Sequence, residues 1–120
     1  EMVKPLLKQN ADVGKRHGIY VAFHSCGAIR PIIGDLIEIG VDILDPLQAA
    51  AEGMEPQVLK DNYGDRICLH GGICTQYLLP GGTPEEVRDE VRRLEAVDLA
   101  VSDDPLARQS AEKSPSAPPV

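Results

Sequence analysis

The amino-acid sequence predicts an α/β fold built on a parallel β-sheet. Three short apolar segments with the composition of buried strands, 19–23, 41–44 and 66–69, alternate with four segments of helical character. Each strand begins about 20 to 25 residues after the previous one, which is the spacing of successive βα units. The pattern fits a doubly wound sheet and a closed barrel equally well.

The first βα unit opens with a helix that is already under way at Glu1. Its first apolar positions are Met2, Val3, Leu6 and Leu7. Gly18 then precedes 19–23, a β-branched and aromatic run typical of a strand buried on both faces. Because no helix start precedes Glu1, we expect the natural amino terminus to lie upstream and the chain to be a fragment.

The second unit contains the clearest helix of the sequence. Apolar side chains recur at helical spacing, at Ile29, Ile32, Ile33, Leu36 and Ile37. Pro31 lies near the predicted start of this helix, and Gly40 follows its end. The strand at 41–44 comes next, and a further helix is predicted over 55–63.

The third unit leads from the strand at 66–69 through a glycine-rich loop into the last helix. Thr83-Pro84-Glu85-Glu86 combines a capping box with proline at the first helical position. On the exposed face of this helix, the spacing predicts the ion pairs Glu85–Arg88 and Asp89–Arg93. We therefore assign 1–97 to the β/α unit and 98–120, rich in Ala, Ser and Pro, to a disordered tail.

Charge and composition exclude several classes of partner. Nineteen acidic against twelve basic side chains leave a net charge of −7, which disfavours nucleic acid and anionic membrane surfaces. No apolar run approaches the roughly 20 residues of a membrane span, and no signal peptide is recognisable. Three cysteines without disulfide spacing indicate reduced thiols, so we expect a cytoplasmic protein.

The candidate site lies where the three strands end. Ligands of parallel sheets bind at the carboxyl ends of the strands, and His24, Asp45 and His70 directly follow the three apolar runs. A titratable side chain at the same point of every unit indicates one wall of an active site.

His24-Ser25-Cys26-Gly27 is the sharpest local motif. In an extended segment, residues i and i+2 face the same side, so an imidazole and a thiolate can converge on one zinc ion. A zinc site needs at least three protein ligands, and these are only two. The structural alternative is that His24 makes loop hydrogen bonds while Cys26 packs as a small apolar residue.

For the other candidate site residues, a functional and a structural role are both open. Asp45 either contacts a substrate or forms a turn with Pro46. His70 precedes two glycines, of which Gly72 is a candidate substrate contact through its backbone N–H, although a plain strand-to-loop turn explains both glycines as well. No nucleophile stands out, so the catalytic residues stay unassigned.

Four segments together resemble the uroporphyrinogen decarboxylase superfamily: 24–27, 40–48, 70–73 and 82–87. The resemblance runs in order from about Glu1 to Val97. It implies a β/α-barrel fold, of which this chain would form a part with three strands and four helices. A full barrel needs roughly 250 residues, so we expect the chain to be inactive by itself.

The superfamily contains two branches with different chemistry. Its decarboxylases are metal-free lyases of porphyrin biosynthesis, and its methyltransferases use zinc to move methyl groups from corrinoid proteins to thiols such as coenzyme M. His24 and Cys26 resemble the first two zinc ligands of the methyltransferases. In that branch a later cysteine completes the set, but residues 98–120 contain neither cysteine nor histidine.

Three hypotheses for function follow from this resemblance. The leading one is part of a zinc-dependent methyltransferase that acts on a thiol with a corrinoid protein as partner. The second is a uroporphyrinogen decarboxylase with a tetrapyrrole substrate, although the arginine-containing region and early aspartate of that branch do not map onto these residues. The third is a truncated, inactive barrel remnant. A homodimer stays open under each of the three.

Overall fold

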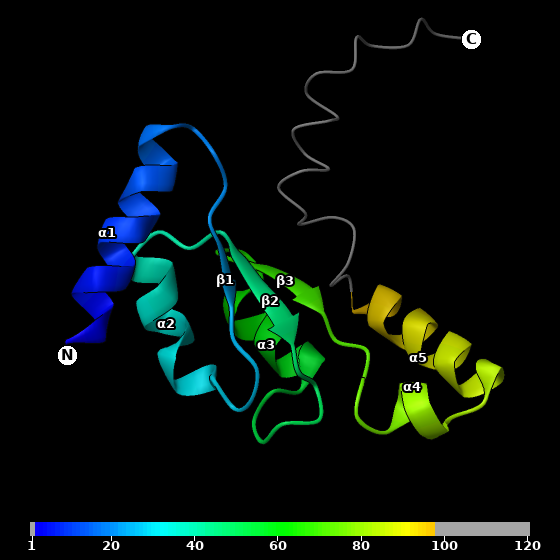
Figure 1. The fold of residues 1–120 in the computed structure, drawn as a ribbon. Coiled ribbons are helices and arrows are strands. Elements are labelled where there is room, and N and C mark those ends of the chain that lie inside the picture. Colours follow the sequence, from blue (N-terminus) through cyan, green and yellow to red (C-terminus); the bar gives the residue numbers. More distant parts are fainter. Residues whose placement is uncertain (1, 98–120) are drawn as a thin grey trace, which may run out of the picture.

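The computed structural model describes residues 2–97 (Figure 1). The elements follow in the order α1 (Val3–Arg16), β1 (Ala22–His24), α2 (Arg30–Glu38), β2 (Ile43–Leu47), α3 (Pro56–Tyr63), β3 (Cys68–Gly71), α4 (Leu78–Gly81) and α5 (Pro84–Ala96). The predicted tail at 98–120 lies outside the described residues. Within the described range, no helix has the length and apolar character needed to cross a membrane.

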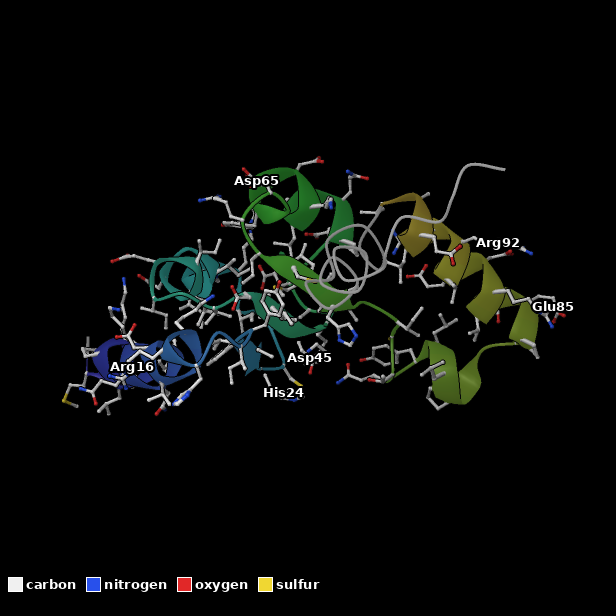
Figure 2. The ribbon with its side chains drawn as sticks, turned by 90° about the horizontal axis from the view of Figure 1, so that it is seen from above. Arg16, His24, Asp45, Asp65, Glu85 and Arg92 are labelled. Atoms are coloured by element: carbon white, nitrogen blue, oxygen red, sulfur yellow. The ribbon has the colours of Figure 1, made fainter. Side chains whose placement is uncertain are left out.

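The three strands form one parallel sheet in the order β1-β2-β3, as the sequence predicts. Viewed from above, α1, α2 and α3 follow one another along one side of these strands (Figure 2). A doubly wound sheet would carry helices on both faces, whereas a barrel carries them on its outer face only. The arrangement is therefore that of part of a parallel β/α barrel.

The core lies between β2, β3 and the helices α2 and α3. Its fully buried side chains are Ile33, Leu36, Leu44, Leu47, Met54 and Leu59. Leu94 of α5 joins the same apolar cluster. Leu44 and Leu47 anchor β2 in the core, while Asp45 and Pro46 between them are only half-buried. The central strand is thus held from one side and offers its polar residue to the other.

The first strand differs from the prediction in position and burial. It begins at Ala22 rather than Ile19, and Ile19 and Tyr20 are 59% and 42% exposed. Within residues 2–97, β1 pairs only with β2, and Ala22 and His24 are exposed, so it is an edge strand that is not covered on both faces. The backbone N–H of Val21, just before the strand, donates to the Asp42 carboxylate at 2.7 Å. This donor is therefore paired with a side chain and not with a neighbouring strand.

The region of the last two helices differs from the prediction in one additional helix and in one ion pair. The sequence predicts four helices, and the described residues form five, because 78–81 makes an additional short turn, α4. The capping box of α5 is present, with Thr83 Oγ1 accepting from Glu86 N and Glu86 Oε2 accepting from Thr83 N. Glu85 pairs with Arg88 as predicted. Asp89 pairs with Arg92 instead of Arg93, because the i,i+3 partner is also within reach.

Two neighbouring isoleucines of α2 test where the core lies. Ile33 is fully buried and Ile32 is 41% exposed. Ile33→Ala should lower the free energy of unfolding by about 2 to 5 kcal/mol, because it leaves a cavity in the core. The matched Ile32→Ala should cost less than about 1 kcal/mol. Urea unfolding followed by circular dichroism measures both, and equal losses would contradict the observed orientation of α2.

Candidate active site

The strand register brings the three predicted polar residues together. His24 of β1 lies directly opposite Asp45 of β2, and the backbone N–H of Ser25 donates to the Asp45 carbonyl at 3.0 Å. On the other side, Leu44 lies opposite Leu69, so the residues that follow them, Asp45 and His70, are neighbours. All three lie within the strands rather than just after them, because each strand extends further than its apolar run suggests.

The Asp45 carboxylate lies between two imidazole rings. His24 Nδ1 is 3.1 Å from Oδ2, and His70 Nδ1 is 2.8 Å from Oδ1. An ionised carboxylate only accepts hydrogen bonds, so each Nδ1 carries a proton and donates it. The two rings are about two-thirds exposed, and Figure 2 shows His24 and Asp45 on the open side of the sheet. We call these three residues the His–Asp–His cluster.

Hydrogen bonding favours the ionised form of Asp45. The hydrogen bond from His70, followed by the one from His24, holds the pKa of Asp45 below its ordinary value. Partial burial opposes this effect but does not cancel it. Asp45 is therefore ionised at neutral pH, as a carboxylate that orients two imidazoles must be.

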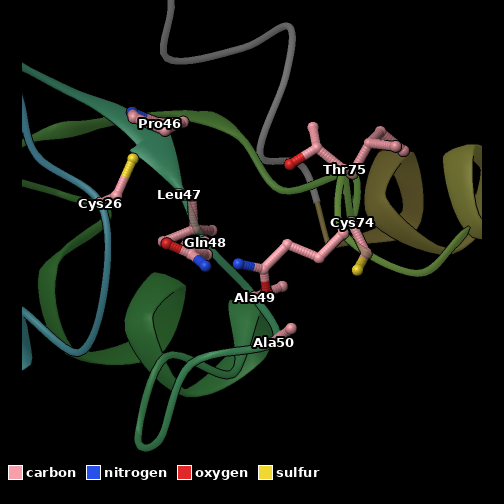
Figure 3. A pocket seen from close by; sticks show the side chains of 10 residues that line it. Cys26, Pro46, Leu47, Gln48, Ala49, Ala50, Cys74 and Thr75 are labelled. Carbon is pink, nitrogen blue, oxygen red and sulfur yellow. The ribbon is translucent and has the colours of Figure 1, made fainter. Parts of the chain in front are cut away.

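A pocket of about 170 Å³ has Pro46, the residue after Asp45, in its wall (Figure 3). The end of β2 and the loops that follow all three strands line it: Cys26, Pro46, Leu47, Gln48, Ala49, Ala50, Ile73, Cys74, Thr75 and Gln76. None of these lining residues is Lys, Arg, Asp or Glu. The described walls thus offer thiols, amides and methyl groups, which suit a small ligand whose contacting part is uncharged.

Gln48 connects the loop after β1 to the end of β2. Its Oε1 accepts the backbone N–H of Gly27 at 2.7 Å. This hydrogen bond holds the 24–27 loop above the end of β2, where Cys26 is exposed on the pocket wall. Nothing in the local sequence pattern predicts this contact, because it depends on the register between the two strands.

The two glycines after His70 both adopt positive φ angles. Gly71 has φ of 97°, and a Cβ there would lie 3.3 Å from the backbone N of Leu47. Gly71 therefore permits β3 to approach β2 closely. Gly72, with φ of 101°, is buried and does not line the pocket, so its predicted substrate contact stays a prediction.

The remaining cysteines and histidine occupy separate environments. Cys68 is buried in β3, as its place in the strand predicts. Cys74 lines the pocket, and backbone N–H groups of Leu78 and Tyr77 lower the pKa of its thiol. His17 lies at the end of α1, where its backbone N–H donates to the Gly14 carbonyl. It is therefore remote from the strand ends that form the site.

The described residues supply part of a zinc site. His24 has the hydrogen bond that metal-binding histidines commonly make, from Nδ1 to a carboxylate. Cys26 provides an accessible sulfur two residues further along. Among residues 2–97, no three His, Cys, Asp or Glu side chains form a group able to hold a metal ion. The donor types fit zinc, and a complete site needs at least one more ligand.

Comparison with known families decides which group of proteins this is. The model of the family described as Uroporphyrinogen decarboxylase (URO-D) matches residues 1–101. The chain belongs to the uroporphyrinogen decarboxylase family. No curated protein and no solved structure matches it. Membership agrees with the parallel β/α arrangement of the described residues.

The pKa of Asp45 tests the geometry of this URO-D site. His70→Ala should raise the pKa of Asp45 towards its ordinary value, and His24→Ala should raise it by less, since the His70 hydrogen bond has the larger effect. With both histidines present, the hydrogen bonds stabilise the fold above about pH 4, and this contribution disappears as the pH falls through the lowered pKa.

A carbon-13 NMR titration of the aspartate carboxyl groups measures this pKa. His17→Ala is the matched control, because it removes an imidazole remote from Asp45 and should leave its pKa unchanged. An Asp45 pKa that is the same in wild type and in His70→Ala would contradict the described hydrogen bond.

Proposed function

We propose that this chain carries two zinc ligands, His24 and Cys26, of a methyltransferase-like member of the uroporphyrinogen decarboxylase family. The substrate would be a small thiol, and the methyl donor would be a corrinoid protein. The observation that carries the proposal is the His24 side chain, whose Nδ1 donates to Asp45 two residues before the exposed thiol of Cys26. Residues outside 2–97 would complete the metal site.

The described residues suit each part of this chemistry. Zinc, when bound, would lower the pKa of the acceptor thiol and favour its thiolate. Asp45 holds the His24 ring in one tautomer, as carboxylates do behind zinc-bound histidines. Gln48 holds the loop that carries Cys26. These side chains orient the ligands without themselves binding metal.

The pocket favours a small thiol over a tetrapyrrole. Its described volume of about 170 Å³ is below the roughly 300 Å³ at which pockets for drug-sized ligands begin. Uroporphyrinogen carries several carboxylates, which cationic side chains would have to balance. The described lining contains no Lys or Arg. A neutral thiol such as a simple alkanethiol meets both conditions better.

Decarboxylation of a tetrapyrrole is the second candidate. The two exposed imidazoles of the His–Asp–His cluster favour it, because they can donate to substrate carboxylates or move protons. Formation of coproporphyrinogen from uroporphyrinogen by the full-length gene product would support this reaction. If that assay shows activity and the protein contains no zinc, the methyltransferase proposal fails.

Zinc content tests the leading proposal directly. The full-length gene product, purified without chelators, should contain about one zinc per chain by mass spectrometry of the metal. His24→Ala and Cys26→Ser should each reduce this content severely, because loss of one protein ligand lowers the affinity of the site for zinc.

Two matched variants serve as controls for the zinc measurement. His17→Ala removes a histidine remote from the strand ends, and Cys74→Ser removes the other thiol of the pocket. Both should retain the zinc of the wild type. A wild type without zinc, or full zinc retention in His24→Ala, would overturn the proposal. Absence of zinc, thiol methylation and decarboxylation together would leave the inactive remnant as the remaining hypothesis.

A further inference from the structure

The His–Asp–His cluster contains one imidazole that zinc binding does not use. Asp45 orients His70 through a 2.8 Å hydrogen bond, shorter than the 3.1 Å bond to His24. No group of residues 2–97 hydrogen-bonds to Nε2 of His70, and the side chain is 67% exposed. Gly72, two residues further on, offers no second ligand of the kind that Cys26 gives His24. His70 therefore needs a different explanation.

A neutral imidazole with its Nδ1–H on a carboxylate is arranged to accept a proton at Nε2. The carboxylate fixes the tautomer and stabilises the imidazolium that forms, as in catalytic His–Asp pairs. His70 and Asp45 have this relation, and the strand register places Asp45 opposite His24 and one residue before Pro46 of the pocket wall. A thiol held in the pocket has one acidic proton, on its sulfur.

We propose that His70 is the proton acceptor for the substrate thiol, and that Asp45 is a positioning residue shared by His70 and His24. The substrate in this proposal rests on the proposed function. The S–H bond breaks with its electron pair left on sulfur, and the proton forms a bond to Nε2 of His70. The thiolate would then accept the methyl group of the corrinoid partner: the S–C bond would form as the Co–C bond breaks, and the electron pair of that bond would remain with cobalt.

The shared role of Asp45 has a spectroscopic signature that does not depend on activity. In the zinc-free full-length gene product labelled with nitrogen-15 histidine, above about pH 8, ordinary imidazoles are neutral. His24 and His70 should then both carry the proton on Nδ1 and none on Nε2. The nitrogen-15 chemical shifts of the ring atoms distinguish these tautomers.

The Asp45→Asn variant tests whether Asp45 positions both rings. The asparagine oxygen can accept from one Nδ1–H, but its NH2 group donates and so favours an unprotonated Nδ1 on the other ring. One of the two histidines should therefore change to the Nε2–H tautomer. Asp65→Asn, which removes the same charge from an exposed site, should change neither ring. Unchanged tautomers in Asp45→Asn would overturn the shared positioning role.

A series of thiols with different pKa values tests proton acceptance by His70. His70→Ala should slow methylation of a thiol that is protonated at the assay pH by about 10²- to 10⁴-fold, the usual contribution of a positioned base. The deficit should shrink towards none for a thiol that is already ionised, because no proton then needs removal. Equal deficits across the series would overturn the role.

These results can be separated from those on the proposed function. His70→Ala should retain zinc, whereas His24→Ala should lose it. If the wild type methylates no thiol, the proposed function fails and proton acceptance by His70 fails with it. The tautomer measurement still decides whether Asp45 positions both rings. Loss of zinc in His70→Ala would make His70 a metal ligand and overturn its assignment as proton acceptor.

Discussion

The parallel register between β1 and β2 is the constraint on which the site depends. It places His24 directly opposite Asp45, while the next pair of strands brings His70 to the other side of the same carboxylate. A slip of one residue would turn Asp45 towards the core and separate all three side chains. Leu44 and Leu47, both buried, prevent that slip by anchoring β2 on either side of Asp45.

The strand ends divide into two regions with different chemistry. The His–Asp–His cluster concentrates the charge and the titratable groups, and the adjacent pocket is lined by thiols, amides and apolar side chains. Cys26 belongs to the pocket but lies two residues from His24, so it connects the regions. In the proposed reaction, the pocket would hold the small neutral thiol and the cluster would accept its proton.

The sequence predicts the elements better than their ends or contacts. The stripe around Ile33 and the capping box at Thr83 predict α2 and α5, because local spacing and local hydrogen bonds determine both. The turn at 78–81 is missed, since a four-residue helix has no periodicity to detect. The sequence also places polar residues at all three strand ends. It does not predict the shared carboxylate at Asp45, which depends on register between segments far apart in the chain.

The central proposal is that zinc binds to His24, which ends β1 and donates to Asp45, and to Cys26 in the loop that follows. X-ray absorption at the zinc edge of the full-length gene product tests this claim most directly. The expected nearest neighbours include an imidazole nitrogen at about 2.0 to 2.1 Å and a sulfur at about 2.3 Å, with the sulfur signal reduced in Cys26→Ser. A spectrum with oxygen and nitrogen neighbours alone, or a sulfur signal unchanged in that variant, would contradict the claim.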